Sequence, residues 1–243
     1  AKKVEDEVVY SGSDVEPIVK KTTTVNIYAG TVNGSVFGGG RGDLASLGED
    51  HSDIEARNFG NTTVIVENSD NTKANIKTAV YGGSNVNGVL KKDAMVTLIG
   101  GTVGDSENQD KDVVFGGGYG APTLVNGDVT MNIGEEGQTS AGAIIYGHVY
   151  GGGALGNTNE AWVTDTSTEP ATTTLQPVAN TKTLVNLLKG TINGYAYGGG
   201  LGDAGTAAIV GGYVIVTLNG AKVQQVFGCN NLNGTPKGHV KVW

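Results

Sequence analysis

The residues that most invite a chemical interpretation are Arg41, Gly42 and Asp43, an integrin-type tripeptide that directly follows three glycines. The same place later in the chain reads Leu201, Gly202 and Asp203. Both stretches are similar to the calcium-binding pattern G-G-x-G-x-D, but their aspartate falls one residue early and no nine-residue period follows. The sequence contains several copies of a repeat, and in them the glycines are followed by a variable residue, a glycine and a small residue. We therefore expect the tripeptide to arise from the repeat. Arg41, Asp43 and Asp203 stay candidate ligand-binding residues.

Residues 49–53, Glu-Asp-His-Ser-Asp, form the one acidic loop that we consider for a loop-bound calcium ion. Hard cations take several oxygen ligands, but a solvated acidic loop is the favoured interpretation, and we expect no other cofactor. The three histidines share no metal-ligand spacing. Cys229 has no recurring His or Asp partner and is interpreted as a small structural thiol.

Sugar chemistry is the other chemistry that these residues could perform. Glycoside cleavage usually needs two carboxylates facing each other across a cleft. The acids here are expected in the N-terminal 21 residues and in loops, as for Asp110, Asp112 and Glu135. Tyr119 and Trp162, both expected in projecting loops, are the best aromatic platforms for a sugar ring. We therefore predict no enzyme and no catalytic residue, and we predict Tyr119 and Trp162 as ligand-binding candidates.

A repeated pentapeptide must position all these loops. The pentapeptide is Val36-Phe37-Gly38-Gly39-Gly40, and similar copies of it follow. The aromatic residues of successive copies are 44, 34, 35, 47 and 30 positions apart. Self-similarity at this scale predicts a repeat architecture. The six aromatics are expected to stack as an internal structural ladder, and the glycines to form a corner where only small residues fit between stacked copies. The ladder residues are Phe37, Tyr81, Phe115, Tyr150, Tyr197 and Phe227.

Each repeat predicts a strand, a corner, a second short strand and the glycine corner. Val25 and Ile27 alternate with polar neighbours, which is typical of a strand with one buried face. Asn-Gly predicts the tight turns between the strands. Insertions fall at the first corner, in residues 104–111 and 138–144. The variable segments that follow the glycines are expected to project from one side, and the threonine-rich one is predicted as an extended solvent loop. These segments are residues 41–61, 119–126, 154–181 and 201–211.

The composition excludes several classes of protein. Glycine accounts for 41 of 243 residues, and the net charge is −8 without any basic cluster longer than two lysines. A phosphate backbone needs a positive stripe, so no nucleic-acid partner is expected. No apolar run approaches the roughly 18 residues of a membrane-spanning helix, so no membrane insertion is expected. A single cysteine excludes an internal disulfide framework.

The favoured fold class is all-β: a parallel β-solenoid, or right-handed β-helix, of about six coils with variable corner loops. A six-bladed β-propeller is the alternative, but the shortest repeat step of 30 residues leaves little room for four strands. Residues 1–21 are predicted as an N-terminal lead-in or cap with one strand near residues 8–10. Residues 22–243 are predicted as one repeat domain.

The run Gly30-Thr31-Val32-Asn33-Gly34, the pentapeptide after it, and residues 226–238 resemble glycine-rich β-solenoid repeats of large secreted or cell-surface adhesin-like proteins of Bacteroidota. The resemblance covers residues 22–243. It implies a fragment of a longer repeat protein, located outside the cell or on its surface. The expected function is a non-catalytic structural and adhesive module that displays loops to a host-surface or glycan ligand, or contacts neighbouring repeats of its parent. The alternative is a carbohydrate-active enzyme or glycan-binding module on a β-helix scaffold.

Overall fold

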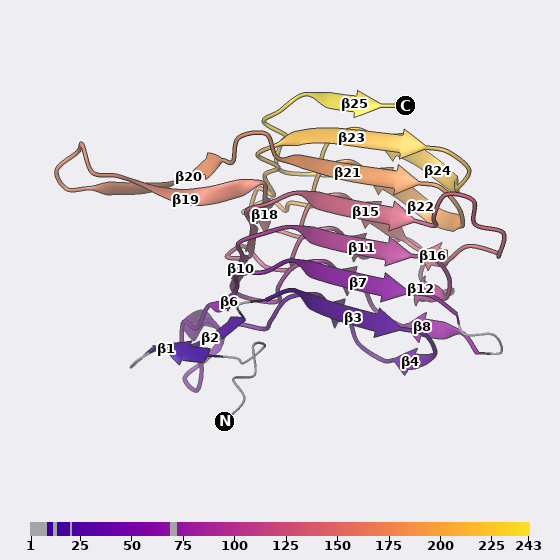
Figure 1. Ribbon diagram of the computed structural model, residues 1–243, viewed down its shortest axis with the longest axis horizontal. Helices are drawn as coiled ribbons and strands as arrows, with labels where there is room; N and C mark the ends of the chain where they lie inside the picture. The colour runs from indigo at the N-terminus through magenta and orange to yellow at the C-terminus, as the bar shows by residue number, and fades with distance from the viewer. Residues whose placement is uncertain (1–8, 12–13, 20, 69–71) are drawn as a thin grey trace.

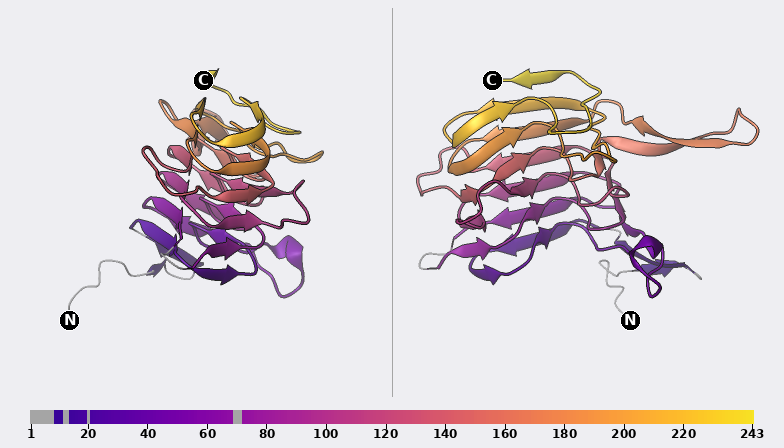
Figure 2. Two further views of the ribbon diagram at one scale, coloured as in Figure 1. Left: turned by 90° about the vertical axis from the view of Figure 1, so that its right-hand side faces the viewer. Right: turned by 180° about the vertical axis from the view of Figure 1, so that it is seen from behind.

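Three sheets of stacked repeats make up most of the molecule. A computed structural model describes residues 9–11, 14–19, 21–68 and 72–243. Each of the first four repeats contributes one strand to a seven-stranded sheet, two to a ten-stranded sheet and one to a six-stranded sheet. Figure 1 shows the seven-stranded sheet face-on, from β3 at the bottom to β25 at the top, and Figure 2 shows the same stack from the side and from behind.

The seven-stranded sheet contains the alternating strands that the sequence predicts. Its strands pair parallel and in register, so that Val25, Val64 and Val96 lie in one row. In the order of the sheet the strands are β25 (Val240–Val242), β23 (Tyr213–Leu218), β21 (Lys182–Leu187), β15 (Val129–Ile133), β11 (Ala94–Leu98), β7 (Thr62–Val66) and β3 (Thr23–Ile27). Outward-facing polar side chains also form hydrogen bonds from one repeat to the next, as Asn186 Nδ2 donates to Asn132 Oδ1 at 2.9 Å.

The ten-stranded sheet is formed by the two short strands of each repeat. One column holds β4 (Gly30–Val32), β8 (Ala74–Ile76), β12 (Thr102–Gly104) and β16 (Ile144–Tyr146). The other holds β5 (Val36–Phe37), β9 (Val80–Tyr81), β13 (Asp112–Phe115) and β17 (His148–Tyr150). The long strand β22 (Thr191–Tyr197) pairs with both columns, and β24 (Lys222–Phe227) pairs with β22.

The six-stranded sheet runs in the order β1 (Val9–Ser11), β2 (Asp14–Val19), β6 (Ala56–Asn58), β10 (Gly88–Leu90), β14 (Leu124–Val125) and β18 (Asn157–Thr158). Strand β1 corresponds to the strand predicted near residues 8–10, of which residue 8 lies outside the described residues, as do residues 1–7, 12–13 and 20 of the predicted lead-in. Strand β2 pairs antiparallel with β1 and parallel with β6, which attaches the described part of the lead-in to the end of this sheet.

The predicted fold class is corrected by this topology. A propeller needs antiparallel blades, whereas strands of successive repeats pair parallel throughout the three sheets. The predicted solenoid also does not describe the sheets, because β22 joins the two columns of short strands into one sheet. The path of that sheet runs through nine strands, doubles back at β22 and nearly closes on itself. The molecule is therefore all-β and built from parallel sheets, but it is neither the solenoid nor the propeller that the repeat predicted.

The aliphatic core lies between the seven-stranded and ten-stranded sheets. Val64, Val96 and Leu98 from one sheet pack with Ile76 and Val80 from the other, and all five are fully buried. Alternate residues of each strand point to opposite faces, so the valine or alanine before each ladder aromatic packs in or against this core. The aromatic itself points to the opposite face of its strand.

Five of the ladder rings belong to a second cluster, separate from the aliphatic core, and the sixth, Phe227, stacks on Tyr197 at the end of the column. Neighbouring rings are parallel within 11° and their centroids are 4.6 to 4.9 Å apart. The aromatic residues therefore stack in one continuous column, which lies on the outer face of the β5–β9–β13–β17 strands rather than inside the main core. Phe115 and Tyr150 in the middle of the column are fully buried, and Phe227 at its end is 40% exposed.

The first glycine of each triplet lets one repeat approach the next. The N–H of Gly82 donates to the Phe115 carbonyl at 3.0 Å, and the N–H of Gly116 to the Tyr150 carbonyl at 2.9 Å. A Cβ atom at Gly116 would overlap the carbonyl oxygen of Gly151 in the next repeat. The corner therefore excludes every side chain, because the backbone of the next repeat occupies the space.

The predicted solvent loop at residues 154–181 is also corrected. It contains β18 and an antiparallel ribbon of β19 (Glu160–Asp165) and β20 (Thr172–Pro177) that projects from the stack in Figure 1. The threonines that suggested a loop are β-branched and favour strands. The base of the ribbon is fixed by Glu160, which is 1% exposed and accepts hydrogen bonds from Lys237 Nζ at 2.7 Å and Asn157 Nδ2 at 2.9 Å.

Candidate binding groove

The residue that follows each glycine triplet occupies the same place in every repeat. Its N–H donates to the preceding repeat, as for Asn85 to the Gly40 carbonyl at 2.9 Å and Tyr119 to the Ser84 carbonyl at 2.9 Å. These residues form a column beside the aromatic rings, which we call the recognition column; Arg41 and Tyr119 in it are exposed, whereas Ala154 is buried. Its members are Arg41, Asn85, Tyr119, Ala154, Leu201 and Asn231.

The recognition column corrects one alignment of the repeats. By sequence, Leu155 would match Leu201, because both residues are followed by a glycine and a small polar residue. The structure instead pairs Ala154 with Leu201 in a parallel bridge. Leu155 is an extra residue with a left-handed backbone, at φ 64°. The fourth repeat therefore presents a small side chain in the column.

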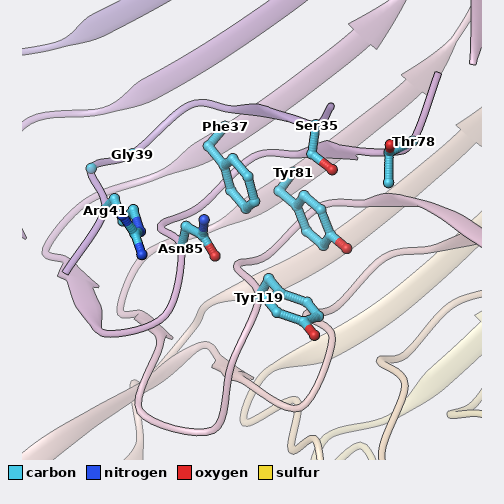
Figure 3. Close-up of a pocket in the computed structure, with 9 residues that line it drawn as sticks. Ser35, Phe37, Gly39, Arg41, Thr78, Tyr81, Asn85 and Tyr119 are labelled. Atoms are coloured by element: carbon cyan, nitrogen blue, oxygen red, sulfur yellow. The ribbon is translucent and has the colours of Figure 1, made fainter. Parts of the chain in front are cut away.

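An open pocket of about 620 Å³ lies at the N-terminal end of the recognition column. It brings together Arg41 and Tyr119, which the sequence predicted as separate loop candidates, with Asn85 between them (Figure 3). The described residues that line it are Ser35, Phe37, Gly39, Gly40, Arg41, Thr78, Tyr81, Asn85 and Tyr119. The pocket is therefore lined by side chains from three repeats, among them the ladder rings Phe37 and Tyr81 and the ring of Tyr119.

Side-chain size opens the pocket at this end of the stack. Two residues before each ladder aromatic, the first two repeats carry Ser35 and Ala79, whereas the fourth and fifth carry His148 and Tyr195. The His148 and Tyr195 rings stack at 4.8 Å. Small side chains thus leave space over Phe37 and Tyr81 that larger side chains occupy further along the stack.

The pocket presents one exposed aromatic ring. Tyr119 is 46% exposed and meets Tyr81 edge to face, with centroids 5.7 Å apart. Tyr81 is buried, and burial raises the pKa of its hydroxyl well above its usual range, with further contributions from Tyr119 and Asp112. The Tyr81 hydroxyl therefore stays neutral, and Tyr119 is the most exposed of the three rings that line the pocket, since Phe37 is partly buried.

Asp112 is a carboxylate that sequence reasoning assigned to a loop. It lies in β13, and its Oδ1 accepts a hydrogen bond from the Tyr150 hydroxyl, which also accepts one from Asn231 Nδ2 at 2.9 Å. Burial, followed by this hydrogen bond to Asp112, raises the pKa of Tyr150. The arrangement keeps the tyrosine protonated and uses the carboxylate to satisfy a buried hydroxyl.

Asp43 is placed outside the pocket. Its Oδ1 lies 2.7 Å from His51 Nδ1, and its Oδ2 accepts the N–H of Ser52 at 3.2 Å. The hydrogen bond from His51 is the largest cause that lowers the pKa of Asp43. The Asp43 backbone also pairs with Ile54, so this residue closes the loop that follows Arg41.

The other two sequence candidates lie elsewhere. Asp203 Oδ1 accepts the N–H groups of Gly205 at 2.9 Å and Thr206 at 2.6 Å, which makes it a turn residue. Trp162 lies on the projecting ribbon opposite Leu175 and is 56% exposed. Neither residue lines the pocket with Arg41 and Tyr119.

The acidic loop at residues 49–53 does not assemble a cluster of metal ligands. Asp53 Oδ1 accepts the N–H of Ala45 at 2.8 Å, and His51 is engaged with Asp43. Within the part of the chain that the structure describes, no group of three or more His, Cys, Asp or Glu side chains is arranged to hold a metal ion. In that same part, no helix is long and apolar enough to cross a membrane.

Sequence reasoning missed Asn85, Ser35 and Thr78 as pocket residues. Asn85 follows Gly-Gly-Ser rather than three glycines, which hid its equivalence to Arg41. The signal was present in the spacing, because Asn85 and Arg41 both lie four residues after a ladder aromatic. Comparison with known proteins adds no further residue, since no protein-family model, curated protein or solved structure matches this chain.

Proposed function

We propose that the protein is a non-catalytic structural and adhesive module that binds a glycan in the pocket formed by Arg41, Asn85 and Tyr119. The exposed Tyr119 ring beside the Asn85 amide carries the proposal. A sugar has an apolar face of C–H groups and a rim of hydroxyls, so it needs one accessible ring and a few polar groups around it. The pocket supplies both from adjacent repeats.

The scaffold around the pocket suits a stiff support. Main-chain hydrogen bonds join each glycine corner to the next, and the ring column runs through all six repeats. Each repeat adds a rise of about 4.8 Å. The resemblance to glycine-rich repeats of Bacteroidota surface proteins supports a location outside the cell or on its surface, where such a support would hold the pocket toward a ligand.

Binding is favoured over catalysis by the chemistry of the groove. Among the described residues that line the pocket, none is a carboxylate, whereas glycoside cleavage usually needs two. The nearby carboxylate of Asp112 already accepts the hydrogen bond of the Tyr150 hydroxyl. A tyrosine acting as a base needs a lowered pKa, and the pKa values of Tyr81 and Tyr150 are raised.

A glycan array followed by titration calorimetry tests the proposal. We expect one class of glycan to bind the whole chain, and Tyr119→Ala to weaken that binding at least about tenfold, or about 1.4 kcal/mol. Tyr28→Ala is the matched control, because Tyr28 is 47% exposed but does not line the pocket. Binding that survives Tyr119→Ala, or steady release of new reducing ends from a polysaccharide, would contradict the proposal.

A further inference from the structure

One side chain gives the pocket its charge. Arg41 is the only charged residue among those that line it, and it is exposed. Its guanidinium makes no ion pair with any residue in the described part of the chain. The nearest acid in sequence, Asp43, is already held by His51 and the Ser52 N–H. The pocket therefore carries an unneutralised positive charge.

The positive charge of Arg41 is opposite in sign to the net charge of the protein. The chain has 24 acidic and 16 basic residues, for a net charge of −8, so its long-range field repels anions. An anion would bind only where a local cation outweighs that field. Arg41 supplies such a cation beside the exposed Tyr119 ring, and the guanidinium presents a planar fork of donors that matches a carboxylate or sulfate.

Arg41 lies at the open N-terminal end of the recognition column. In the five later repeats the residue of the recognition column donates its N–H to the preceding repeat, as Asn85 does to Gly40 and Tyr119 does to Ser84. Arg41 begins the column, and its N–H has no acceptor among the residues that the structure describes. By the same geometry this N–H points off the N-terminal end of the stack, away from Asn85 and Tyr119, so the guanidinium is the donor group of Arg41 that the pocket can use.

Spacing places the Arg41 guanidinium within reach of a sugar that stacks on Tyr119. Arg41, Asn85 and Tyr119 occupy successive rows of parallel strands, so Arg41 and Tyr119 are about 10 Å apart along the stack. The Asn85 amide lies between them (Figure 3). No other member of the recognition column is charged, which restricts this combination to the N-terminal pocket.

We propose that the glycan bound in this pocket is acidic, and that Arg41 binds its carboxylate or sulfate group while a sugar ring packs on Tyr119. The inference rests on the proposed function, since it assigns the class of ligand to the same pocket. It makes Arg41 the specificity residue and Tyr119 the platform. A neutral glycan would satisfy Tyr119 and Asn85 but leave the positive charge unpaired.

Calorimetry with three oligosaccharides tests this assignment: a uronate oligomer, the same oligomer with its carboxyl groups reduced to alcohols, and a sulfated oligomer. We expect at least one acidic oligomer to bind about tenfold or more tighter than the reduced one, and the preferred oligomer identifies the acid group. Arg41→Gln should lower its affinity to that of the reduced oligomer, and Arg41→Lys should retain part of it. Lys91→Gln, an equal charge change at an exposed residue away from the pocket, should have no effect.

The outcomes separate the two proposals. If the reduced oligomer binds as tightly as the acidic ones and Arg41→Gln changes nothing, while Tyr119→Ala still abolishes binding, the acidic ligand is wrong and the glycan pocket stands. If neither acidic nor neutral glycans show binding that depends on Tyr119, both proposals are wrong. If Lys91→Gln lowers the affinity for the acidic oligomer as much as Arg41→Gln does, the effect is one of general charge and the proposed role of Arg41 is wrong.

Discussion

Replacing Phe115 by Ala tests whether the ring column holds the repeats together. Phe115 is 1% exposed, and its ring stacks on Tyr81 and on Tyr150 at 4.9 Å each. Truncating a buried aromatic to Ala costs about 3–5 kcal/mol, and each stacked pair contributes about 0.5–1.5 kcal/mol beyond its buried area. We expect Phe115→Ala to lower the free energy of unfolding by about 4–5 kcal/mol.

Phe227→Ala is the matched control at the end of the column. Phe227 is 40% exposed and stacks on one ring of the column, Tyr197, at 4.9 Å. With less area buried and one stacking partner instead of two, the same substitution should cost about 2 kcal/mol. The difference between the two variants isolates the contribution of a position inside the column.

Urea unfolding followed by far-UV circular dichroism measures both variants. The ends of a repeat stack can unfold separately from its middle, so the slope of the transition should be compared with that of the unsubstituted chain. A loss below about 2 kcal/mol for Phe115→Ala would refute the reasoning. Equal losses for Phe115→Ala and Phe227→Ala would refute it as well.

Two further predictions concern the glycine corner and the Asp43 loop. Gly116→Ala should cost about 2–3 kcal/mol, because the new Cβ would overlap the Gly151 carbonyl, whereas Gly34→Ala, with nothing within 4 Å of its Cβ, should stay within about 0.5 kcal/mol in urea unfolding. An NMR titration should place the pKa of Asp43 below its ordinary value of about 3.9, and His51→Ala should raise it. Because the folded pKa is lowered, this contribution to stability is present above about pH 3.9 and is lost as the pH falls through the folded value. Asp165, whose pKa is lowered by Ser167 instead, is the control, and an unchanged Asp43 pKa in His51→Ala would contradict the assignment.

The repeat predicted those features that depend on identical residues at identical places. Phe115 and its equivalents stack because parallel pairing in register sets like residues above one another. The glycines were predicted as a corner for the same reason. The path of the sheet was not predictable, because it depends on β22 running without a break from Thr191 to Tyr197 where earlier repeats divide into two strands.

The pocket was predicted only in part. Arg41 and Tyr119 were identified as exposed loop residues, but their separation of 78 positions hid the fact that they flank the same amide. Asp112 was assigned to a loop because an insertion precedes it, whereas pairing with β17 extends the strand to include it. Trp162 was expected in a projecting segment, and it lies on the projecting ribbon, away from the pocket, where its role as a ligand-binding residue stays a prediction.

The recognition column has a consequence for how such a surface can change. Its six positions hold Arg, Asn, Tyr, Ala, Leu and Asn, yet the main chains of the last five all donate an N–H to the preceding repeat. The fold therefore places few demands on the exposed side chains of Arg41 and Tyr119, whereas Ala154 is buried against the ring column. Substitutions at the exposed positions can be selected for affinity with little cost in stability. A row of exchangeable positions about 4.8 Å apart is a natural starting point for evolving, or engineering, new binding preferences one residue at a time.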